Sequence, residues 1–336
     1  MYPVDIRQIK TLTPPRLINA GKVYLSYLYS RITGKAVVKG YPVVLSIEPT
    51  SLCNLKCPQC PTGMEALKRD SGYMNMDLYR SILDGLAKYI TTIQLYFQGE
   101  PFMNKLLPEM ITYAKSRNIY TITSTNGHFL TDENIGKIIN AGLDALIIGL
   151  DGVSEESYSK YRKNGKFDTV ISGIERLVDE KRKNSAGIPK IYLQFLVLKG
   201  NEDQIEEIRK LGKKLQVDRV LIKTAQVYPD TDTRDLLPSN PDYSRYTEKN
   251  CELVLKNSIP DHCKRIWTTA VFTWDGILAS CCFDKDAGHS FGIWNGAPFD
   301  VLWRGEKAMR FRQQVLENRK TVAICRNCTE GLKEFK

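Results

Sequence analysis

Apolar and polar positions repeat with two different periods along residues 41–226, and the two periods alternate. Short apolar runs rich in β-branched residues predict six strands, and apolar residues spaced three or four apart predict helices between them. The predicted strands are Val43–Glu48, Thr92–Gln98, Tyr120–Thr125, Ala145–Leu150, Ile191–Leu198 and Arg219–Thr224. The predicted helices are Asp77–Lys88, Lys105–Arg117, Asp132–Ala141, Phe167–Lys183 and Gln204–Leu215. This alternation predicts an α/β protein whose parallel sheet curves into a full or partial (β/α)6 barrel.

Polar residues recur on one face of five predicted strands, whereas apolar residues fill the opposite face. Counting by twos, the polar face carries Ser46 and Glu48, then Gln94, Tyr96 and Gln98, then Ser124 and Asn126, then Gln194 and Lys223. A parallel sheet covered by helices on one side shows such residues where its other side lines a cavity. We therefore predict a polar barrel interior. Taken one at a time, each of these residues could instead be a polar group at a strand end whose hydrogen bonds are made within the protein.

The segments that flank this core differ from it in pattern. A helix is predicted over Arg16–Ile32, after two prolines, and it should pack on the main domain. Because it is basic and amphipathic, peripheral contact with a membrane surface is the less favoured alternative. The run AVFTWDGILASCC, which starts at residue 270, predicts a hairpin that turns at Asp275 and Gly276. The predicted domains are 1–40, an N-terminal helical extension; 41–226, the barrel; 227–262, a proline-rich linker; and 263–336, a small C-terminal domain.

The composition is that of an ordinary globular protein, with 42% hydrophobic and 26% charged residues among 336. No uncharged apolar run of about 18 residues and no secretory signal is evident, so we expect a cytoplasmic protein. A net charge of +10 could suit a phosphorylated substrate, an acidic electron carrier, nucleic acid or an anionic membrane. Since the basic residues are scattered, no nucleic-acid partner is expected. Nine cysteines in a reducing compartment favour metal binding over disulfides.

Three of these cysteines follow the first predicted strand in the run EPTSLCNLKCPQCP. Cys53, Cys57 and Cys60 are spaced C-x3-C-x2-C, one thiol short of a closed site. Zinc and ferredoxin-type sites normally close with four protein ligands. Three ligands leave a metal position open to a small molecule, so the triad predicts chemistry at the metal.

A second set comprises four cysteines of the C-terminal part: Cys263, Cys281, Cys325 and Cys328. Four thiols can close either a [4Fe-4S] site or a structural zinc site, and the spacing alone does not choose between them. Neighbours on a strand point to opposite faces, so Cys281 is preferred to Cys282 as a ligand. Cys251 and Cys282 are expected to be ordinary thiols.

The triad, in a loop after the first strand of a six-unit α/β barrel, resembles the radical S-adenosylmethionine (SAM) superfamily. The resemblance implies a [4Fe-4S] cluster on the three thiolates, with SAM bound to the open iron. One electron then cleaves SAM to methionine and a 5′-deoxyadenosyl radical. The electron would come from a flavodoxin-like or ferredoxin-like donor.

The resemblance extends to other strand ends. Gln98, Gly99 and Glu100 match the GGEP motif that binds the methionyl amino group, with Gln98 replacing the first glycine. The other matches are Ser124 and Asn126 near the ribose, Asp151 of an LDG element, Arg162 of a YR element as carboxylate partner, and backbone near Val197–Asn201 for adenine. Gln59 stands where many members carry an aromatic residue, so adenine contact there should differ.

The second cysteine set is similar in order to the auxiliary-cluster domain of the SPASM and Twitch subfamilies. Because the sequence stops eight residues after Cys328, the Twitch type with one auxiliary [4Fe-4S] cluster is expected. Structural zinc remains the alternative at this site.

These features predict an oxidoreductase that removes a hydrogen atom from a sugar, an aminocyclitol or another polar small molecule. The auxiliary cluster would take up the second electron, and an alcohol substrate would also need a base. Candidates for this base are Lys223, Asp284 and Asp286. One alternative is a SPASM-type maturase of a peptide or protein, and another is a non-catalytic zinc-binding interaction module.

Overall fold

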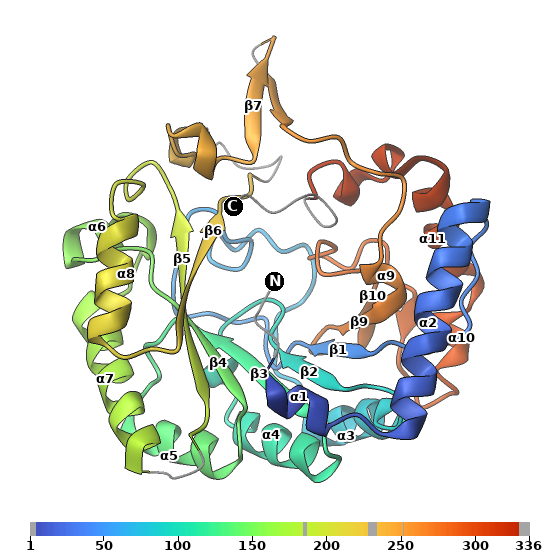
Figure 1. The fold of residues 1–336 in the computed structure, drawn as a ribbon, viewed down its shortest axis with the longest axis horizontal. Coiled ribbons are helices and arrows are strands. Elements are labelled where there is room, and N and C mark those ends of the chain that lie inside the picture. The colour runs from blue at the N-terminus through green and yellow to red at the C-terminus, as the bar shows by residue number, and fades with distance from the viewer. Residues whose placement is uncertain (1–4, 184–186, 228–233, 251, 329–336) are drawn as a thin grey trace. The chain divides into compact units, whose positions relative to one another are not determined.

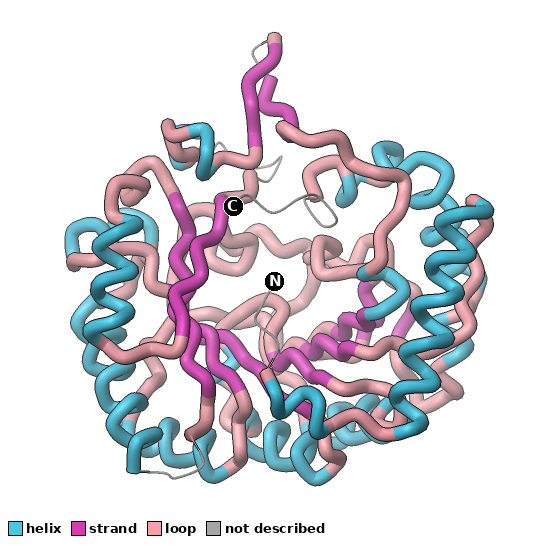
Figure 2. Tube along the Cα trace, viewed as in Figure 1, coloured by secondary structure: helices cyan, strands magenta, loops and turns pink. Residues whose placement is uncertain are grey.

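The structure is a computed structural model that describes residues 5–183, 187–227, 234–250 and 252–328. The chain forms two compact units. The first unit comprises Met1–Leu52, Leu67–Ile122 and Ile259–Gly331, and the second comprises Cys53–Ala66, Thr123–Ser258 and Leu332–Lys336. Helices and strands alternate along most of the chain (Figures 1 and 2).

The first unit contains a mixed sheet in the order β11-β10-β9-β1-β2. Its strands are β1 (Val44–Ile47), β2 (Thr92–Leu95), β9 (Thr269–Phe272), β10 (Ile277–Ala279) and β11 (Gly292–Ile293). Strand β1 pairs in parallel with both β2 and β9, whereas β9, β10 and β11 pair antiparallel. The C-terminal strands therefore extend the sheet that begins with the first strand. The predicted Asp-Gly hairpin is present as β9 and β10, and Gly276 takes a φ of +84° at its turn.

Helices of the first unit come from three stretches of the chain. They are α1 (Ile6–Lys10), α2 (Pro14–Thr33), α3 (Met76–Leu86), α4 (Leu107–Ser116), α9 (Arg265–Thr268), α10 (Asp300–Trp303) and α11 (Glu306–Asn318). Short 3-10 helices lie at Pro101–Met103 (η1), Arg319–Thr321 (η4) and Ala323–Cys325 (η5). Helix α2 starts on two prolines and ends at Gly34, whose φ of +70° favours glycine.

The second unit contains the parallel strands β4 (Ala145–Gly149), β5 (Lys190–Val197) and β6 (Arg219–Thr224), paired in that order. Strand β3 (Tyr120–Thr125) begins in the first unit and ends in the second. Every residue of β4 is buried, as its apolar sequence requires. Helices α7 and α8 lie beside β5 and β6 (Figure 1). The unit's helices are α5 (Asp132–Asn140), α6 (Glu155–Tyr161), α7 (Phe167–Lys183) and α8 (Ile205–Lys214), with short 3-10 helices at Arg234–Leu236 (η2) and Pro241–Tyr243 (η3).

The predicted α/β class is confirmed, because parallel strands follow one another through helices and a small antiparallel part lies at the C-terminal end of the sequence. All six predicted strands appear within three residues of their expected ends. Five helices, α1, α6, α9, α10 and α11, were not predicted. The stretch 227–262 holds an antiparallel hairpin, β7 (Tyr246–Lys249) and β8 (Glu252–Leu255), that the proline-rich pattern did not reveal. The four domain boundaries remain a prediction.

None of the helices that the structure describes is both long and apolar enough to cross a bilayer.

Candidate functional site

The cysteine triad lies in the loop that follows β1, and this loop belongs to the second unit. Cys57 is buried, whereas Cys53 and Cys60 are partly exposed. The loop is fixed at its centre, where the Lys56 N–H donates to the Lys163 carbonyl at 3.1 Å. Two accessible thiols beside one buried thiol suit a site that must admit a ligand.

Packing holds the buried thiol in place. Cys57 belongs to a small hydrophobic cluster with Leu55, Tyr161, Leu198 and Ala225. Gly63 approaches so closely that a Cβ there would lie 2.6 Å from the Cys57 nitrogen. The loop can therefore fold back on itself only with glycine at this position.

Asn126, which follows β3, contacts the triad directly. Its Nδ2 lies 3.8 Å from the Cys53 Sγ and donates to the Asn54 Oδ1 at 2.7 Å. Its Oδ1 accepts from the His128 backbone N–H and faces the His128 Nδ1, both at 3.1 Å. Since the His128 Nε2 accepts from the Lys166 N–H at 2.8 Å, we assign the ring proton to Nδ1. The predicted Asn126 thus lies at the triad, oriented by a histidine that sequence reasoning missed.

Burial also sets the charge of this histidine. It lowers the pKa of His128, and the nearby Arg162 acts in the same direction. The neutral ring matches its two roles, one as donor and one as acceptor.

Arg162 lies close to Cys57 of the triad. Its Nε donates to the Asp151 Oδ2 at 2.6 Å, and the Asp151 Oδ1 accepts from the Leu196 N–H at 2.7 Å. Its guanidinium occupies the space above Gly149 in β4, where any Cβ would collide with it. The two predicted residues Asp151 and Arg162 therefore form one buried ion pair, tied to the neighbouring strand.

The guanidinium and the Cys57 thiol influence each other. Burial raises the pKa of Cys57 to about 11, while Arg162 acts to lower it. Burial alone would lower the pKa of Arg162, but the charges of Asp151 and Cys57 outweigh it and raise that pKa. Arg162 remains cationic and favours a thiolate at Cys57.

The Gln98, Gly99 and Glu100 element follows β2 in the first unit. Gly99 takes a φ of +72°, and a Cβ there would collide with the Thr50 carbonyl. The Glu100 N–H donates to the Leu52 carbonyl at 2.7 Å, and its buried carboxylate accepts from the Phe102 N–H at 3.2 Å. Because Leu52 directly precedes Cys53 in the chain, this element fixes the residues that lead into the triad.

A buried ion pair that the sequence did not reveal lies beside this element. Glu48, at the end of β1, accepts from both terminal nitrogens of Arg69, at 2.5 and 2.8 Å. Its carboxylate also accepts from the N–H groups of Gln98 and Trp274, at 3.2 and 3.1 Å. The Arg69 Nε reaches the Lys285 carbonyl at 2.8 Å. Glu48 was predicted to face a cavity, and here it joins the first strand to the C-terminal part of the same unit.

Three other residues of the predicted polar face are half-buried in the second unit. They are Ser124 on β3, Gln194 on β5 and Lys223 on β6. Their apolar neighbours Leu193 and Phe195 are fully buried. On β5, Gln194 is therefore more accessible than the apolar residues on either side of it.

The four cysteines of the second set are all buried within the first unit: Cys263, Cys281, Cys325 and Cys328. Burial raises the pKa of Cys281, and its neighbours Cys282, Cys263 and Cys328 raise it further. Cys325 and Cys328 are joined by a tight turn in which the Cys328 N–H donates to the Cys325 carbonyl at 3.0 Å. Cys282 is half-buried, which distinguishes it from Cys281. Cys251 lies outside the described residues.

Arg319 places a positive charge among these thiols. The side chain is fully buried, its Nη2 donates to the Cys328 Sγ at 3.3 Å, and its Nη1 donates to the His262 carbonyl at 3.1 Å. Burial acts to lower the pKa of Arg319, but Cys263 and Cys328, with a smaller contribution from Cys325, raise it. Sequence reasoning missed Arg319 because one arginine in a basic helical stretch gives no signal of its partners.

The two predicted carboxylates near the second set have structural partners. Asp284 is buried, and its oxygens accept from the N–H and hydroxyl of Ser280 and from the His289 N–H, at 3.1 to 3.3 Å. Asp286 is exposed and accepts from the Lys68 N–H at 2.7 Å. Asp284 thus holds the loop after Cys281 closed.

Within residues 5–183, 187–227, 234–250 and 252–328, no three His, Cys, Asp or Glu side chains have the arrangement of ligands around one metal ion. The donor chemistry nevertheless fits iron–sulfur clusters. Both sets consist of thiols, which iron–sulfur clusters require, and each has a guanidinium that offsets the charge of thiolates.

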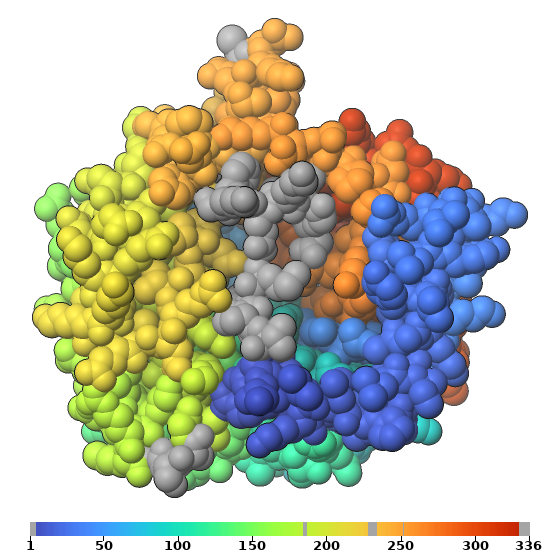
Figure 3. Space-filling model, viewed as in Figure 1, coloured from blue at the N-terminus to red at the C-terminus, as the bar shows by residue number. Residues whose placement is uncertain are grey.

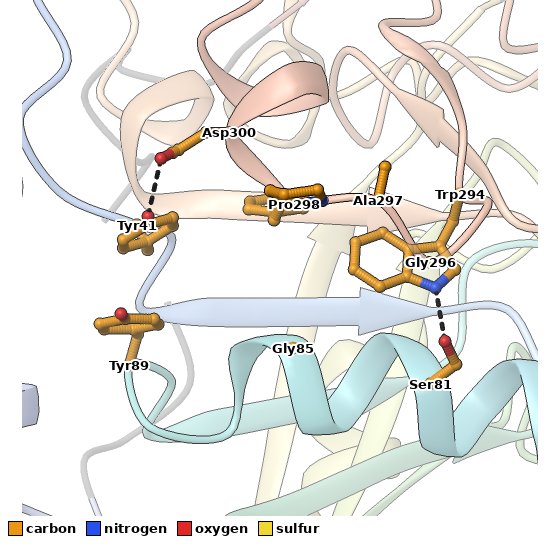
Figure 4. Close-up of a pocket in the computed structure, with 10 residues that line it drawn as sticks. Tyr41, Ser81, Gly85, Tyr89, Trp294, Gly296, Ala297, Pro298 and Asp300 are labelled. Atoms are coloured by element: carbon orange, nitrogen blue, oxygen red, sulfur yellow. Dashed lines mark hydrogen bonds between the residues drawn. The ribbon is translucent and has the colours of Figure 1, made fainter.

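A cavity of about 440 Å³ lies elsewhere in the first unit (Figure 4). Its walls include the stacked rings of Tyr41 and Tyr89, whose centroids lie 4.2 Å apart. They also include Trp294, whose Nε1 donates to the Ser81 Oγ at 2.8 Å. Tyr41 and Tyr89 precede β1 and β2, so the cavity lies toward the amino ends of these strands. Both the triad and the Gly99 element follow the carboxyl ends, where α/β barrels place their reacting groups. We assign no catalytic role to this cavity.

Comparison with known protein families identifies the chain. The family model of the radical SAM superfamily matches residues 47–212, which include the triad, Gly99, Asn126, Asp151 and Arg162. This chain belongs to the radical SAM superfamily. A second family model, SPASM, described as an iron–sulfur cluster-binding domain, matches residues 263–329. The predicted resemblance is confirmed, and both iron–sulfur clusters and SAM are implied. The zinc alternative has no support.

Curated relatives of this radical SAM chain differ in activity. It is 29% identical to Fe-coproporphyrin III synthase of Methanosarcina barkeri over 171 residues. The matched region covers 51% of this chain and 41% of that protein. It is 27% identical over 193 residues to PqqA peptide cyclase of Bradyrhizobium diazoefficiens (56% and 48%) and 27% identical over 183 residues to mycofactocin maturase MftC of Mycolicibacterium smegmatis (53% and 45%). The chain spans about half the length of the curated relatives it matches.

Solved structures show the same fold. SuiB of Streptococcus suis bound to S-adenosylmethionine matches with a TM-score of 0.62 at 13% identity, over 93% of this chain and 76% of that one. BtrN in complex with AdoMet and 2-DOIA matches with a TM-score of 0.53 at 20% identity, over 88% of this chain and 97% of that one. Such low identities establish the radical SAM fold and leave the substrate open.

Proposed function

We propose that this radical SAM enzyme carries out a two-electron oxidation of a small polar molecule. It would hold one [4Fe-4S] cluster on Cys53, Cys57 and Cys60 and an auxiliary [4Fe-4S] cluster on Cys263, Cys281, Cys325 and Cys328. The observation that carries the proposal is the difference in accessibility between the two sets, since the first has partly exposed thiols and the second is wholly buried. Bound clusters of this kind supply one-electron chemistry.

The residues around the triad would bind and orient SAM. Arg162 keeps its charge beside Cys57 and is held by Asp151, so it can pair with the cofactor carboxylate. Glu100 has the charge to pair with the cofactor ammonium. Gln98 and Gly99 supply the turn that presents it, while Ser124 and Asn126 supply polar groups for the ribose.

The residues around the tetrad would stabilise a buried cluster. Arg319 donates to the Cys328 sulfur and offsets the negative charge that four thiolates bring. An arginine in this position favours the more negative, reduced state of a cluster, because opposite charges attract strongly where water is excluded. The tetrad is therefore suited to accept an electron.

Lys223 is the best of the three candidates for a base. It lies half-buried on β6. Asp284 is fully engaged in its own loop, and Asp286 is exposed and binds a backbone N–H. We propose that Lys223, in its neutral amine form, accepts the proton of the substrate hydroxyl and becomes an ammonium.

The small-molecule substrate is supported by the fold match to BtrN, whose structure contains 2-DOIA and is covered over 97% of its length. A peptide or protein substrate is the second candidate, supported by the matches to PqqA peptide cyclase and to mycofactocin maturase. We also propose a flavodoxin-like or ferredoxin-like electron donor and a cytoplasmic location.

One experiment tests the reaction type first and the substrate second. The anaerobically purified chain, reconstituted with iron and sulfide, should form 5′-deoxyadenosine from SAM and dithionite. Failure with a full iron content would overturn the proposal. Deuterated polyols and aminocyclitols should then transfer deuterium to 5′-deoxyadenosine, whereas transfer from deuterated peptides alone would favour the maturase.

A further inference from the structure

Exposed apolar side chains gather on the two N-terminal helices, α1 and α2. Twelve large hydrophobic side chains are exposed among the described residues, and nine of them lie between residues 6 and 32. The nine are Ile6, Ile9, Leu12, Leu17, Ile18, Tyr24, Leu25, Tyr29 and Ile32. Both helices lie at the surface (blue in Figure 3). We call this set of nine side chains the N-terminal apolar face.

Helix α2 has the reverse of the usual amphipathic arrangement. Its exposed residues Leu17, Ile18, Leu25 and Ile32 fall within about a third of the helix circumference at 100° per residue. The opposite side is buried and mostly polar: Arg16, Asn19, Val23, Ser26, Tyr27 and Ser30. A helix of a globular protein normally turns its apolar stripe inward.

Specific contacts hold α2 in this orientation. The Arg16 guanidinium donates to the carbonyls of Thr11, Ala87, Arg117 and Asn118, at 2.6 to 2.9 Å. Further along, the Asn19 Nδ2 donates to the Tyr41 carbonyl at 3.0 Å, and the Asn19 Oδ1 accepts from the Tyr41 N–H at 2.8 Å. These bonds would be lost if the helix turned its apolar side inward. The N-terminal apolar face is therefore built to be exposed.

Positive charge surrounds this face. Residues 6–47 contain seven basic residues and no acidic residue. Arg16 is buried and Arg7 pairs with Asp5, while the remaining five are not buried. On the helix surface, Lys22 and Arg31 lie at the two edges of the apolar stripe. The exposed cations are Lys10, Lys22, Arg31, Lys35 and Lys39.

We propose that the N-terminal apolar face binds the surface of an anionic lipid bilayer, with α2 lying in the plane of the interface. An apolar stripe flanked by lysine and arginine is the pattern of interfacial helices. A second copy of the chain would set these cations against each other in a symmetric contact, which disfavours self-association through this face. Charge complementarity thus selects an anionic surface. This inference does not depend on the substrate or on the reaction.

Vesicle sedimentation with the full-length, reconstituted protein tests the proposal. The protein should sediment with vesicles of phosphatidylglycerol and phosphatidylcholine, bind far less to pure phosphatidylcholine, and dissociate as salt is raised. Leu25→Glu with Ile32→Glu should weaken binding roughly tenfold or more, because two carboxylates would enter the apolar layer. Lys22→Gln and Arg31→Gln should each weaken it roughly fivefold.

A matched control uses exposed apolar residues elsewhere in the same unit. Ile293→Glu with Val301→Glu makes the same chemical change at side chains that are 62% and 63% exposed, and should leave vesicle binding unchanged. Iron content and the thermal midpoint should match the unmodified protein in both double variants.

Three results would overturn the proposal. The first is the absence of vesicle binding, and the second is binding that Leu25→Glu with Ile32→Glu leaves intact. The third is a dimer in light scattering that this double variant dissociates, which would assign the face to a second copy instead.

Discussion

The two cysteine sets offer the same donor group, a thiol, but differ in how accessible that thiol is. In the second unit, Cys53 and Cys60 are partly exposed and only Cys57 is buried, whereas all four thiols of the tetrad in the first unit are buried. Each set has an arginine against one thiol, but the other partners of the two arginines differ. Arg162 stays cationic and is held in an ion pair by Asp151, while Arg319 donates to the His262 carbonyl and to the Cys328 sulfur.

We propose that this difference distinguishes the SAM-binding site from the electron-accepting site. A guanidinium held by a carboxylate is fixed in position and can present its remaining donors to a bound carboxylate. A guanidinium that donates directly to a thiol sulfur favours added negative charge on that sulfur. The triad therefore suits ligand binding, and the tetrad suits electron uptake.

Removing the buried thiol of the triad should have the largest effect. Cys57→Ala removes one of three proposed iron ligands and opens a hole in the small cluster around Leu55 and Tyr161. We expect formation of 5′-deoxyadenosine to fall to background, measured by chromatography after incubation with SAM and dithionite. Formation at the unmodified rate would contradict the assignment of the triad.

Adjacent cysteines in the tetrad region offer a sharp test of the second site. Cys281→Ala should lower iron content by about four atoms per chain, the content of one [4Fe-4S] cluster. Cys282→Ala should retain the full iron content, because Cys282 is half-buried whereas its neighbour Cys281 is buried with the rest of the tetrad. Iron and sulfide analysis of both variants checks this. Equal iron loss in the two would show that the neighbouring thiol also ligates.

Arg319→Gln should change the tetrad and leave the triad alone. The variant removes a charge and two hydrogen bonds from a buried position, and should cost about 2 to 4 kcal/mol of unfolding free energy. The auxiliary cluster should become harder to reduce, as measured by a redox titration followed with electron paramagnetic resonance. The exposed Arg310→Gln is the control and should cost less than about 0.5 kcal/mol. An unchanged midpoint potential would argue against the role of Arg319.

Two glycines in the second unit test the position of Arg162. Gly149→Ala should cost about 1 to 3 kcal/mol and weaken SAM binding, since the added methyl group collides with the Arg162 guanidinium. Gly136→Ala places the same methyl group in helix α5, where nothing lies within 4 Å, and should stabilise by about 1 kcal/mol. Chemical denaturation and calorimetric titration with SAM measure both effects. Equal behaviour of the two variants would mean that Arg162 has room to move.

The smallest expected effect is a pH dependence at His128. Its pKa is lowered below 6.5 in the folded protein, chiefly by burial, so the unfolded chain binds the proton more tightly. The contribution of His128 to stability is then complete above pH 6.5 and is lost as the pH falls below it. We expect the free energy of unfolding to fall on acidification, measured by denaturation across this range. His128→Gln should remove this part of the pH dependence of stability. The same dependence in the variant would contradict the role assigned to His128.

The sequence predicted the strands better than it predicted which side chains contact one another. All six core strands were readable because each alternates or runs apolar within a few residues, which is a local property. Glycine at position 99 and the pair of Asp151 and Arg162 were recognised by their order along the chain. The partners of Glu48, Asn126 and Cys328 were not, because Arg69, His128 and Arg319 come from segments whose local pattern is ordinary.

By itself the sequence determined the type of chemistry, since three thiols in one loop and four in the C-terminal part define the donors wherever the chain places them. It also determined the α/β class through the period of its apolar residues. Only the tertiary structure decided which thiols are accessible and which arginine lies against each set, because burial and long-range contacts depend on segments distant in the chain. It likewise decided that α2 turns its apolar side outward, since the carbonyls that hold Arg16 come from three other parts of the chain.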